Sequence, residues 1–312
     1  MPLPPRFDVR RRLGGGGMGE VIEAWDRLLG RTVAVKRPLP KYRSDLDVLA
    51  MLSDEARIGR RIQSPQVVPI LDYGEDLESP FIVMPLIDGL SGSGLLRSLG
   101  GDLLPLDAVC RIGAQIALGA HALHELLRSE GATVDVIHRD ISPPNVLIGR
   151  DGIVRVTDFG IAKSPHNSAR TATGVVKGKP GYMAPEQLRY ESADRRADLF
   201  ALGVLVFELS ISARLYPTRN NRLGAQEILH APPPDLGLYR GDAPREFIEL
   251  LFELLAKSPA DRPADAAIVA RRLMLIADEV VHDEEPTSIA SLIAHYQSIG
   301  AVPRDDATEP RA

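Results

Sequence analysis

Cysteine and long apolar runs are scarce in this sequence of 312 residues, and each shortage excludes a class of protein. The single cysteine, Cys110, allows neither an internal disulfide nor a zinc site built from cysteines. The longest apolar run, Leu199 to Phe207, is far too short to span a bilayer, and the first residues contain no apolar core of signal-peptide length. We therefore expect a cytoplasmic protein without a membrane span.

Basic residues are also in the minority. The chain has 37 Lys and Arg against 42 Asp and Glu, which gives a net charge of −5. A surface that binds nucleic acid or an anionic membrane needs a basic patch, so neither is expected to be a main partner. Lysine is much rarer than arginine, and the position of each lysine is therefore informative.

What the chain does contain is an ordinary globular composition, 44% hydrophobic and 25% charged, and enough length for one large domain or two lobes that share a cleft. The N-terminal part has the pattern of β-strands with one helix. We expect strands at residues 9–13, 20–25, 32–36, 67–73 and 80–86, and a helix at 45–62.

From residue 105 onward the pattern is helical. Apolar residues at steps of three and four predict a helix with one buried face from Val109 to Leu126. Residues 199–209 are apolar nearly all round, which is typical of a helix buried in the middle of a lobe. Residues 278–312 have the composition of a tail, with one short helix around Ile289 to Tyr296.

A cluster of glycines stands between the first two expected strands, with the spacing Gly14-x-Gly16-x-x-Gly19. A dinucleotide-binding loop would open a helix, whereas this one leads into a strand, and Gly178-Lys179-Pro180 lacks the Ser or Thr of a Walker-type loop. The interpretation that remains is a hairpin flap whose backbone N–H groups can approach phosphates, because glycine has no Cβ. A flexible surface loop is the alternative.

The helix at 45–62 carries a carboxylate inside its apolar stripe. Glu55 follows Val48 and Met51 at helical spacing, and an unpaired carboxylate there would cost several kcal/mol. We expect Glu55 to pair with Lys36 of the neighbouring strand and to hold that ammonium against nucleotide phosphates. The alternative is a glutamate at the edge of the stripe that reaches solvent.

The densest group of polar residues is His138-Arg139-Asp140, with Asn145 five residues after the aspartate, followed by Asp158-Phe159-Gly160. Carboxylate and amide oxygens on consecutive loops are the ligands that Mg²⁺ prefers, with phosphate completing its shell. A single aspartate could equally be a turn or cap residue. The whole ordered set, which ends in Ala184-Pro185-Glu186, is not explained in that way.

These motifs, in this order, resemble the eukaryotic-like bacterial serine/threonine protein kinases over about residues 7–276. The resemblance implies an α+β, bilobal protein-kinase-like fold with ATP in the cleft between the lobes. The kinase domain would span 7–277, with a β-rich N-lobe with one helix at 7–86, a hinge at 84–89 and a larger helical C-lobe at 90–277. Residues 278–312 would be a C-terminal tail.

The resemblance also implies roles for individual residues. Lys36 would contact the α- and β-phosphates of ATP while Glu55 orients it, and Asp140 would take up the proton of the substrate hydroxyl. Asn145 and Asp158 would hold Mg²⁺ or Mn²⁺. Further nucleotide contacts are expected from Leu13, Gly14, Gly16, Gly19, Val21, Ala34, Met84 as gatekeeper, Pro85, Ile87 and Leu147. Structural support is expected from Asp198, which would brace the catalytic loop, and from an ion pair of Glu186 with Arg262.

Two positions depart from the family pattern. Two residues after the catalytic aspartate these kinases carry a lysine that touches the γ-phosphate, and here Ser142 stands there. Before Ala-Pro-Glu they carry a threonine, and here the residue is Lys179. We expect the two functions to be exchanged, so that the Lys179 amine lies within hydrogen-bonding or one-water reach of Asp140 or Ser142 and is catalytic. The alternative is a solvated Lys179 beside a passive serine.

The expected function is ATP- and Mg²⁺-dependent phosphorylation of Ser or Thr hydroxyls in proteins. A nucleotide-binding pseudokinase is the main alternative, because the usual γ-phosphate lysine is missing from its place. A small-molecule phosphotransferase is disfavoured by the long loop before Ala-Pro-Glu. That loop carries Ser164, Ser168, Thr171 and Thr173, and we expect autophosphorylation at Thr171 or Thr173. No particular protein substrate or oligomeric state follows from the sequence.

Overall fold

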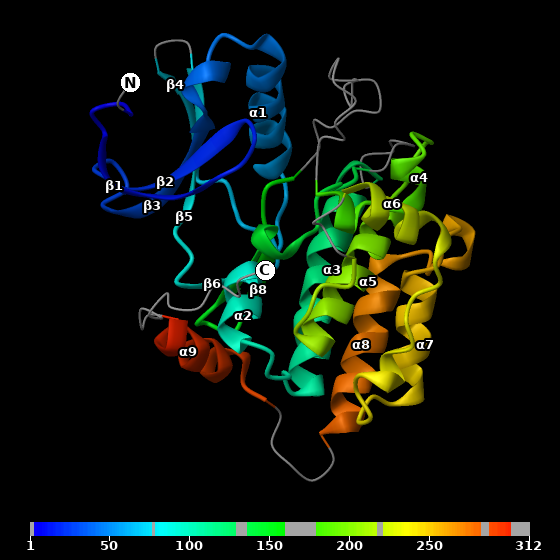
Figure 1. Cartoon of the computed structure of the whole chain (residues 1–312). Coiled ribbons are helices and arrows are strands. Elements are labelled where there is room, and N and C mark those ends of the chain that lie inside the picture. Colours follow the sequence, from blue (N-terminus) through cyan, green and yellow to red (C-terminus); the bar gives the residue numbers. More distant parts are fainter. Residues whose placement is uncertain are drawn as a thin grey trace, which may run out of the picture.

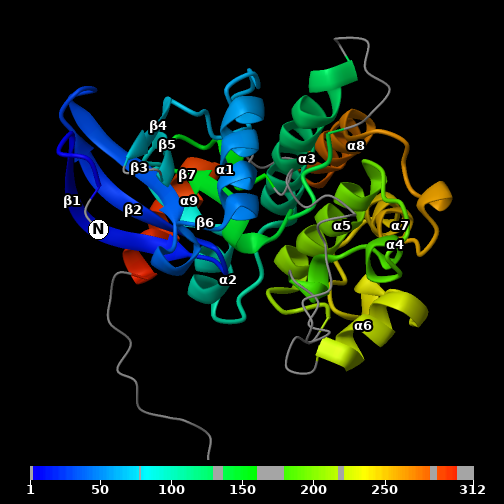
Figure 2. The ribbon, with the colours of Figure 1, turned by 90° about the horizontal axis from the view of Figure 1, so that it is seen from above.

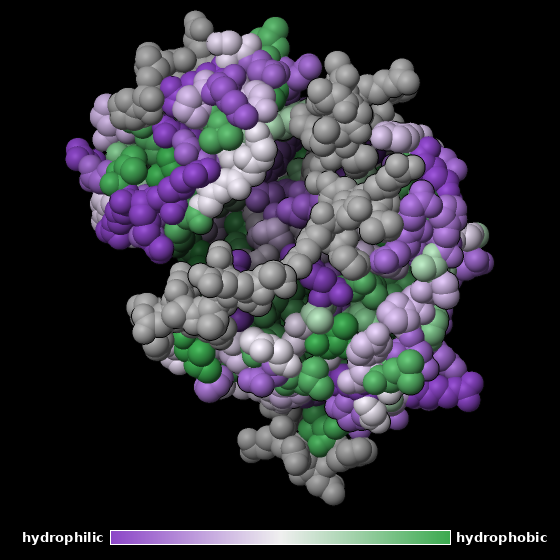
Figure 3. All heavy atoms as spheres, viewed as in Figure 1, coloured by the Kyte–Doolittle hydropathy of each residue, from purple (hydrophilic) through white to green (hydrophobic). Residues whose placement is uncertain are grey.

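The chain forms two lobes of unequal size, seen in Figure 1 as a β-rich lobe at the upper left and a helical lobe at the lower right. The computed structural model describes residues 3–76, 79–128, 136–159, 179–216, 221–281 and 287–300. The space-filling view shows the surface hollowed between the two lobes (Figure 3). This is the protein-kinase fold that the sequence predicts.

The N-lobe is a five-stranded antiparallel sheet in the order β1-β2-β3-β5-β4. Its strands are β1 (Phe7–Gly15), β2 (Gly19–Asp26), β3 (Arg31–Pro38), β4 (Asp72–Asp76) and β5 (Ser79–Pro85), and helix α1 (Leu46–Gly59) packs on it. Alternating side chains serve opposite faces, as the period of a strand requires. Val33 and Val35 lie in one apolar cluster, whereas Ala34 lies in another cluster together with Leu52 and Ala56 of α1.

The strand expected at 67–73 is wrong for most of its length, because β4 begins only at Asp72. The preceding residues pair with the other lobe. Val68 N donates to Val156 O (3.0 Å) and Val156 N donates to Gln66 O (2.9 Å), which forms an isolated parallel bridge at Val67. Residues 66–68 therefore form a contact between the lobes, and the bonds to the N-lobe sheet begin at Leu71, whose N–H donates to Val83 O at 2.8 Å.

The C-lobe is built around helix α5, whose residues 197–210 are all buried. Its helices are α2 (Gly92–Leu99), α3 (Leu106–Arg128), α4 (Pro185–Leu188), α5 (Arg196–Ile211), α6 (Asn221–His230), α7 (Arg245–Leu254), α8 (Ala266–Val280) and α9 (Ile289–Gly300). The C-lobe also contains a small sheet of three strands, β6 (Gly89–Ser91), β7 (Val146–Gly149) and β8 (Val154–Val156). Strand β6 follows the hinge, and β7 and β8 lie between Asn145 and Asp158 in the sequence. The helices expected at 109–126 and 199–209 lie within α3 and α5.

Residues 287–300, in the segment with the composition of a tail, pack on the C-lobe. Helix α9 lies beside α2 and β6 in Figure 1, and Figure 2 shows it below the small sheet. Its residue Ile293 is fully buried in the core of the C-lobe. Across the described parts of the chain, no helix combines the length and the apolar character that a membrane crossing requires.

Candidate active site

The two lobes meet at a cluster of three charged side chains. Lys36 Nζ donates to both carboxylate oxygens of Glu55, at 2.7 and 2.8 Å, and to Asp158 Oδ1 at 2.7 Å. Burial alone would lower the pKa of Lys36, but the two carboxylates outweigh it and raise that pKa above its ordinary value. The same attraction holds the pKa of Asp158 below its usual range despite burial. The ammonium is therefore charged and fixed in direction.

Helix α1 is held in the position that this ion pair needs by a close approach at Gly59. A Cβ added there would lie 2.5 Å from Ile70 Cδ1 and 3.3 Å from Phe159 Cε2. The Phe159 ring in turn meets His138 edge to face, with ring centroids 5.5 Å apart. The residue after Asp158 thus connects α1 of the N-lobe to the catalytic loop of the C-lobe.

Residues 138–145, which the sequence predicts to be the catalytic loop, present Asp140 in a fixed orientation. Asn145 Nδ2 donates to Asp140 Oδ2 and to the Asp140 backbone oxygen, both at 2.9 Å. Two of the four non-glycine residues with positive φ in the described parts of the chain lie here, Arg139 at φ +60° and Asp158 at φ +58°, in the left-handed region that side chains disfavour. Such conformations persist only where surrounding contacts hold them.

At Arg139, Asp198 of α5 supplies such contacts. Its carboxylate accepts hydrogen bonds from the backbone N–H groups of His138 (2.7 Å) and Arg139 (2.8 Å). His124 Nε2 lies 2.8 Å from the same carboxylate, and both side chains are fully buried. Burial would raise the pKa of Asp198, but the hydrogen bond from His124 contributes to lowering it. The sequence predicted the role of Asp198 as a brace but missed His124, whose only signal was its place on the buried helix.

His121, one helical turn before His124, belongs to a different group. His121 Nδ1 lies 3.1 Å from Asp265 Oδ1, and these two residues could share a cation with Glu125. The Arg195 guanidinium already lies 3.5 Å from Glu125 and 3.4 Å from Asp265. Because an arginine supplies the positive charge here, the cluster needs no metal ion to balance it.

The side-chain ammonium of Lys179 lies among the residues of the catalytic loop, although Lys179 is far from that loop in the sequence. Its Nζ donates to Ser142 Oγ at 2.8 Å and to Asn145 Oδ1 at 3.4 Å, and it lies 3.9 Å from Asp140 Oδ1. Ser142 is buried, and its hydroxyl donates to the Asp140 backbone oxygen at 3.2 Å. The contact that we expected between the two departing positions is therefore present.

The side chains expected to surround the adenine form one apolar cluster between the lobes. It contains Val21, Ala34, Met84, Ile87 and Leu147, together with residues of α1. Leu13 and Pro85 lie outside this cluster, and Leu13 is 37% exposed.

The expected glycines form the tip of the β1–β2 hairpin. Gly14 pairs with Val21, and Gly16 N donates to Gly19 O at 2.8 Å. The hairpin adjoins the apolar cluster through Val21, so the predicted phosphate flap and the predicted adenine contacts lie together.

A buried ion pair secures the segment after Lys179. Arg262 donates to both oxygens of Glu186, at 2.7 and 2.8 Å, and to the Arg196 backbone oxygen at 3.0 Å. The side chains of Arg262 and Glu186 are 0% and 3% exposed. The predicted pair is therefore present, and it fixes Ala-Pro-Glu to the start of α5.

Residues 160–178, with Gly160 and all four hydroxyl residues of the expected phosphorylation loop, lie outside the described residues.

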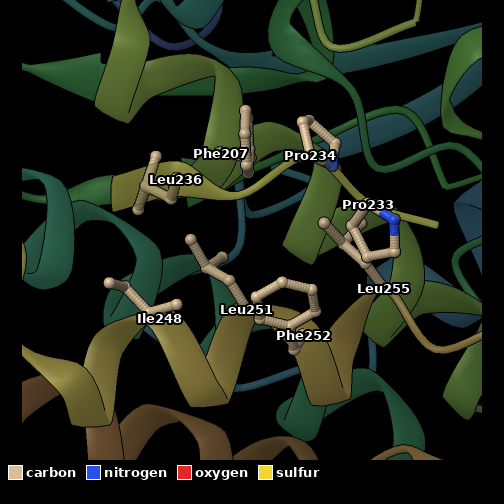
Figure 4. Close-up of a pocket in the computed structure, with 8 residues that line it drawn as sticks. All are labelled: Phe207, Pro233, Pro234, Leu236, Ile248, Leu251, Phe252 and Leu255. Atoms are coloured by element: carbon tan, nitrogen blue, oxygen red, sulfur yellow. The ribbon is translucent and has the colours of Figure 1, made fainter. Parts of the chain in front are cut away.

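An apolar pocket elsewhere in the C-lobe differs in character. Figure 4 shows its lining between α5, α7 and the loop before Leu236, which consists of Phe207, Pro233, Pro234, Leu236, Ile248, Leu251, Phe252 and Leu255. None of these side chains can donate or accept a proton. Asp140 and Asp158, the carboxylates with expected roles in the reaction, lie outside this pocket.

Comparisons with known proteins agree with this geometry. The protein kinase domain family matches residues 7–274. The chain is 38% identical over 279 residues to Tyrosine-protein kinase MasK of Myxococcus xanthus, covering 86% of this chain and 42% of that protein. It is 33% identical over 282 residues to Serine/threonine-protein kinase PknL of Mycobacterium tuberculosis, covering 90% of this chain and 68% of that protein.

Among solved structures, the PknI kinase domain of Mycobacterium tuberculosis superposes with a TM-score of 0.66 at 25% identity, covering 89% of this chain and 100% of that one. The chain spans 42% to 68% of the length of the two curated relatives named above. The matched region contains both lobes and every residue of the charged cluster at their junction. The chain therefore belongs to the protein kinase family.

Proposed function

We propose that this domain transfers the γ-phosphoryl group of ATP to serine or threonine hydroxyls of proteins. The observation that carries the proposal is the assembled set of Lys36, Glu55 and Asp158 beside Asp140 and Asn145. Phosphoryl transfer depends on positioning and charge stabilisation more than on covalent chemistry, and this set supplies both. PknL carries a serine/threonine name, whereas MasK is named a tyrosine kinase, so the acceptor residue needs its own test.

In the proposed reaction Lys36 binds the α- and β-phosphates through its fixed ammonium. Asp140 accepts the proton of the attacking hydroxyl, and the Asn145 amide keeps its carboxylate turned toward that hydroxyl. The donor set fits Mg²⁺, since Asn145 and Asp158 offer an amide and a carboxylate oxygen, both hard ligands. When bound, the ion would neutralise charge on the phosphates. Placement in the cytoplasm is proposed from composition and accords with the use of ATP.

Lys179 takes the part of the γ-phosphate lysine in this proposal. The family places that lysine on the catalytic loop, and here the ammonium comes from the segment before Ala-Pro-Glu. Its hydrogen bond to Ser142 holds the ammonium 3.9 Å from Asp140 Oδ1, and its side chain remains 38% exposed. A charge delivered from the opposite side serves the same oxygen atoms.

The pseudokinase alternative has no support in this geometry. A kinase that had lost catalysis would be expected to lack a carboxylate or an ion pair of the set, and all of them are in place among the described residues. The departure at Ser142 is matched by a lysine in contact with it. We therefore place phosphotransfer above a scaffolding role.

We also propose autophosphorylation at Thr171 or Thr173. Arg139 precedes the catalytic aspartate, and burial lowers its pKa, so an anion nearby would be favourable for this guanidinium. A phosphate on the loop after Asp158 would add nearly two negative charges for arginine to bind. Peptide mapping after incubation with ATP should find phosphate at these threonines, and phosphate found only outside residues 164–173 would contradict the proposal.

The deciding experiment uses γ-labelled ATP with Mg²⁺ or Mn²⁺ and compares the wild type with Asp140→Asn. Label should pass from wild type to itself and to a generic basic protein, and phosphoamino-acid analysis should give phosphoserine or phosphothreonine. Asp140→Asn should bind ATP but transfer no label. Binding of ATP by the wild type without transfer would establish the pseudokinase instead, and phosphotyrosine would move the domain to the tyrosine class.

A further inference from the structure

Helix α9 lies outside the region that the kinase family matches, yet it packs against the part of the C-lobe that follows the hinge. The family match ends at residue 274, whereas α9 spans Ile289–Gly300. It contacts α2, β6 and β7, and Ile293 is 0% exposed in the core (Figures 1 and 2). At its start, Thr287 donates two hydrogen bonds of 2.7 Å to Asp107, one from its backbone and one from its hydroxyl.

One polar side chain of α9 reaches the end of the hinge. Gln297 Nε2 donates to Asp88 Oδ1 at 3.3 Å and to the Gly89 backbone oxygen at 3.2 Å. These two acceptors directly follow Ile87 in the sequence. Ile87 belongs to the apolar cluster of expected adenine contacts between the lobes, which we call the nucleotide cluster. The amide orientation follows from the acceptors, because only the nitrogen of glutamine can donate. Within the described residues, its buried Oε1 has no hydrogen-bond partner.

The segment that Gln297 holds is already tightly confined on its other side. A Cβ added at Gly89 would lie 2.1 Å from the Ile148 backbone oxygen, so β6 lies directly against β7. Strand β7 carries Leu147, which pairs with Ser91 and lies in the nucleotide cluster. A shift of residues 88–89 would therefore be transmitted to two members of the nucleotide cluster, Ile87 and Leu147.

We propose that Gln297 is a positioning residue for nucleotide binding, through which docked α9 fixes the hinge end at Asp88 and Gly89. This inference rests on the proposed function, with the nucleotide contacts that the family resemblance implies for the hinge residues. Displacement of α9 weakens ATP binding, and by linkage ATP binding strengthens the docking of α9. The C-terminal segment thereby becomes part of the nucleotide site without touching the nucleotide.

The test is a charge series at one position in the otherwise unchanged chain. Gln297→Ala removes both hydrogen bonds, and we expect the Kd and the KM for ATP to rise about 2- to 12-fold while kcat stays nearly constant. Gln297→Glu sets a carboxylate against Asp88 and should weaken ATP binding further. Gln297→Lys offers donors only, leaves no orphan acceptor and should restore near-wild-type binding. Ser291→Ala, on the exposed part of the same helix, is the matched control.

A merely structural role gives a different result. All three variants would then lose thermal stability in proportion to the disturbance of α9, with the Kd for ATP of the folded protein unchanged. That outcome, or a change confined to kcat, would overturn the proposal. Because ATP binding is measured by titration without turnover, absence of phosphotransfer would defeat the proposed function and leave this test intact. As a second readout, ATP should slow amide hydrogen exchange in α9 of the wild type but not of Gln297→Glu.

Discussion

Replacing Lys179 by alanine should lower phosphoryl transfer far more than ATP binding. The ammonium lies 3.9 Å from Asp140 Oδ1, and the transferred group must pass beside this carboxylate. A unit negative charge on the transferred group at a similar distance from the ammonium would be stabilised by about 4 kcal/mol with an effective dielectric constant of roughly 20. The Lys179 side chain is 38% exposed, so we discount that energy to about 2 kcal/mol for screening by water, which corresponds to roughly 30-fold in rate.

The assay separates the chemical step from binding. Single-turnover rates at saturating ATP report phosphoryl transfer, and titration of ATP reports affinity. Lys179→Ala should show the rate loss with less than about a threefold change in Kd, because the charge acts where the γ-phosphate becomes loaded in the transition state. Lys179→Arg should recover only part of the rate, since a planar guanidinium does not reproduce a compact ammonium.

The reciprocal exchange is the control for this reasoning. Ser142→Lys combined with Lys179→Thr restores the arrangement usual in the family, and it should recover much of the activity that Lys179→Thr alone loses. The two single changes should therefore be strongly non-additive, as expected for side chains in contact. An unimpaired Lys179→Ala enzyme would refute the exchange, and Ser142 would then be a plain loss of the usual lysine.

Three further changes test other parts of the structure. Lys36→Met should lower kcat at saturating ATP at least ~10²-fold, and Lys36→Arg should be nearly as poor. Near-normal turnover in either variant would contradict the role of Lys36 in binding the phosphates. Arg262→Leu leaves Glu186 buried without its partner and should lower the free energy of unfolding by about 3 kcal/mol in urea titration, while an unchanged midpoint would show that the pair contributes nothing. Burial and the nearby Arg262 lower the pKa of Lys257 to about 8 from 10.5. The unfolded chain therefore binds more protons than the folded chain between these pH values. The free energy of unfolding of the wild type, relative to that of Lys257→Met, should rise from pH 8 to 10.5. A relative free energy that does not change with pH would exclude the lowered pKa of Lys257.

Local pattern predicted much of the fold and the centre of the site. Glu55 was recognised because a carboxylate in an apolar stripe needs a partner, and the partner in the adjacent strand was Lys36. The third member, Asp158, lies 122 residues from Lys36, and although the sequence marked it as a magnesium ligand, its ion pair with Lys36 was not predicted. Spacing along a chain indicates which residues share a helix face, but not which distant loop meets that face.

The features that escaped the sequence have the same physical origin. His124 has the position of a core histidine on a buried helix, and its partner Asp198 is 74 residues away. The strand expected at 67–73 was misplaced because its backbone hydrogen bonds go to β8 in the other lobe. A short helix around Ile289 to Tyr296 was expected, whereas the hydrogen bonds of Thr287 to Asp107 and of Gln297 to Gly89, 180 and 208 residues apart in the sequence, were not.

The catalytic loop illustrates why a residue remote from substrate can determine the site. Arg139 and Asp158 hold left-handed backbone conformations that cost roughly 1–3 kcal/mol each, and neither is a glycine. At Arg139 the strain is held by a hydrogen bond from its own N–H to the buried Asp198 carboxylate, which His124 keeps oriented. A buried carboxylate without hydrogen-bond donors would be strongly destabilising, so Asp198 needs the N–H groups of the loop. The strained loop in turn needs the Asp198 carboxylate as the acceptor that holds its conformation. The direction in which Asp140 faces is therefore determined by the interior of the C-lobe.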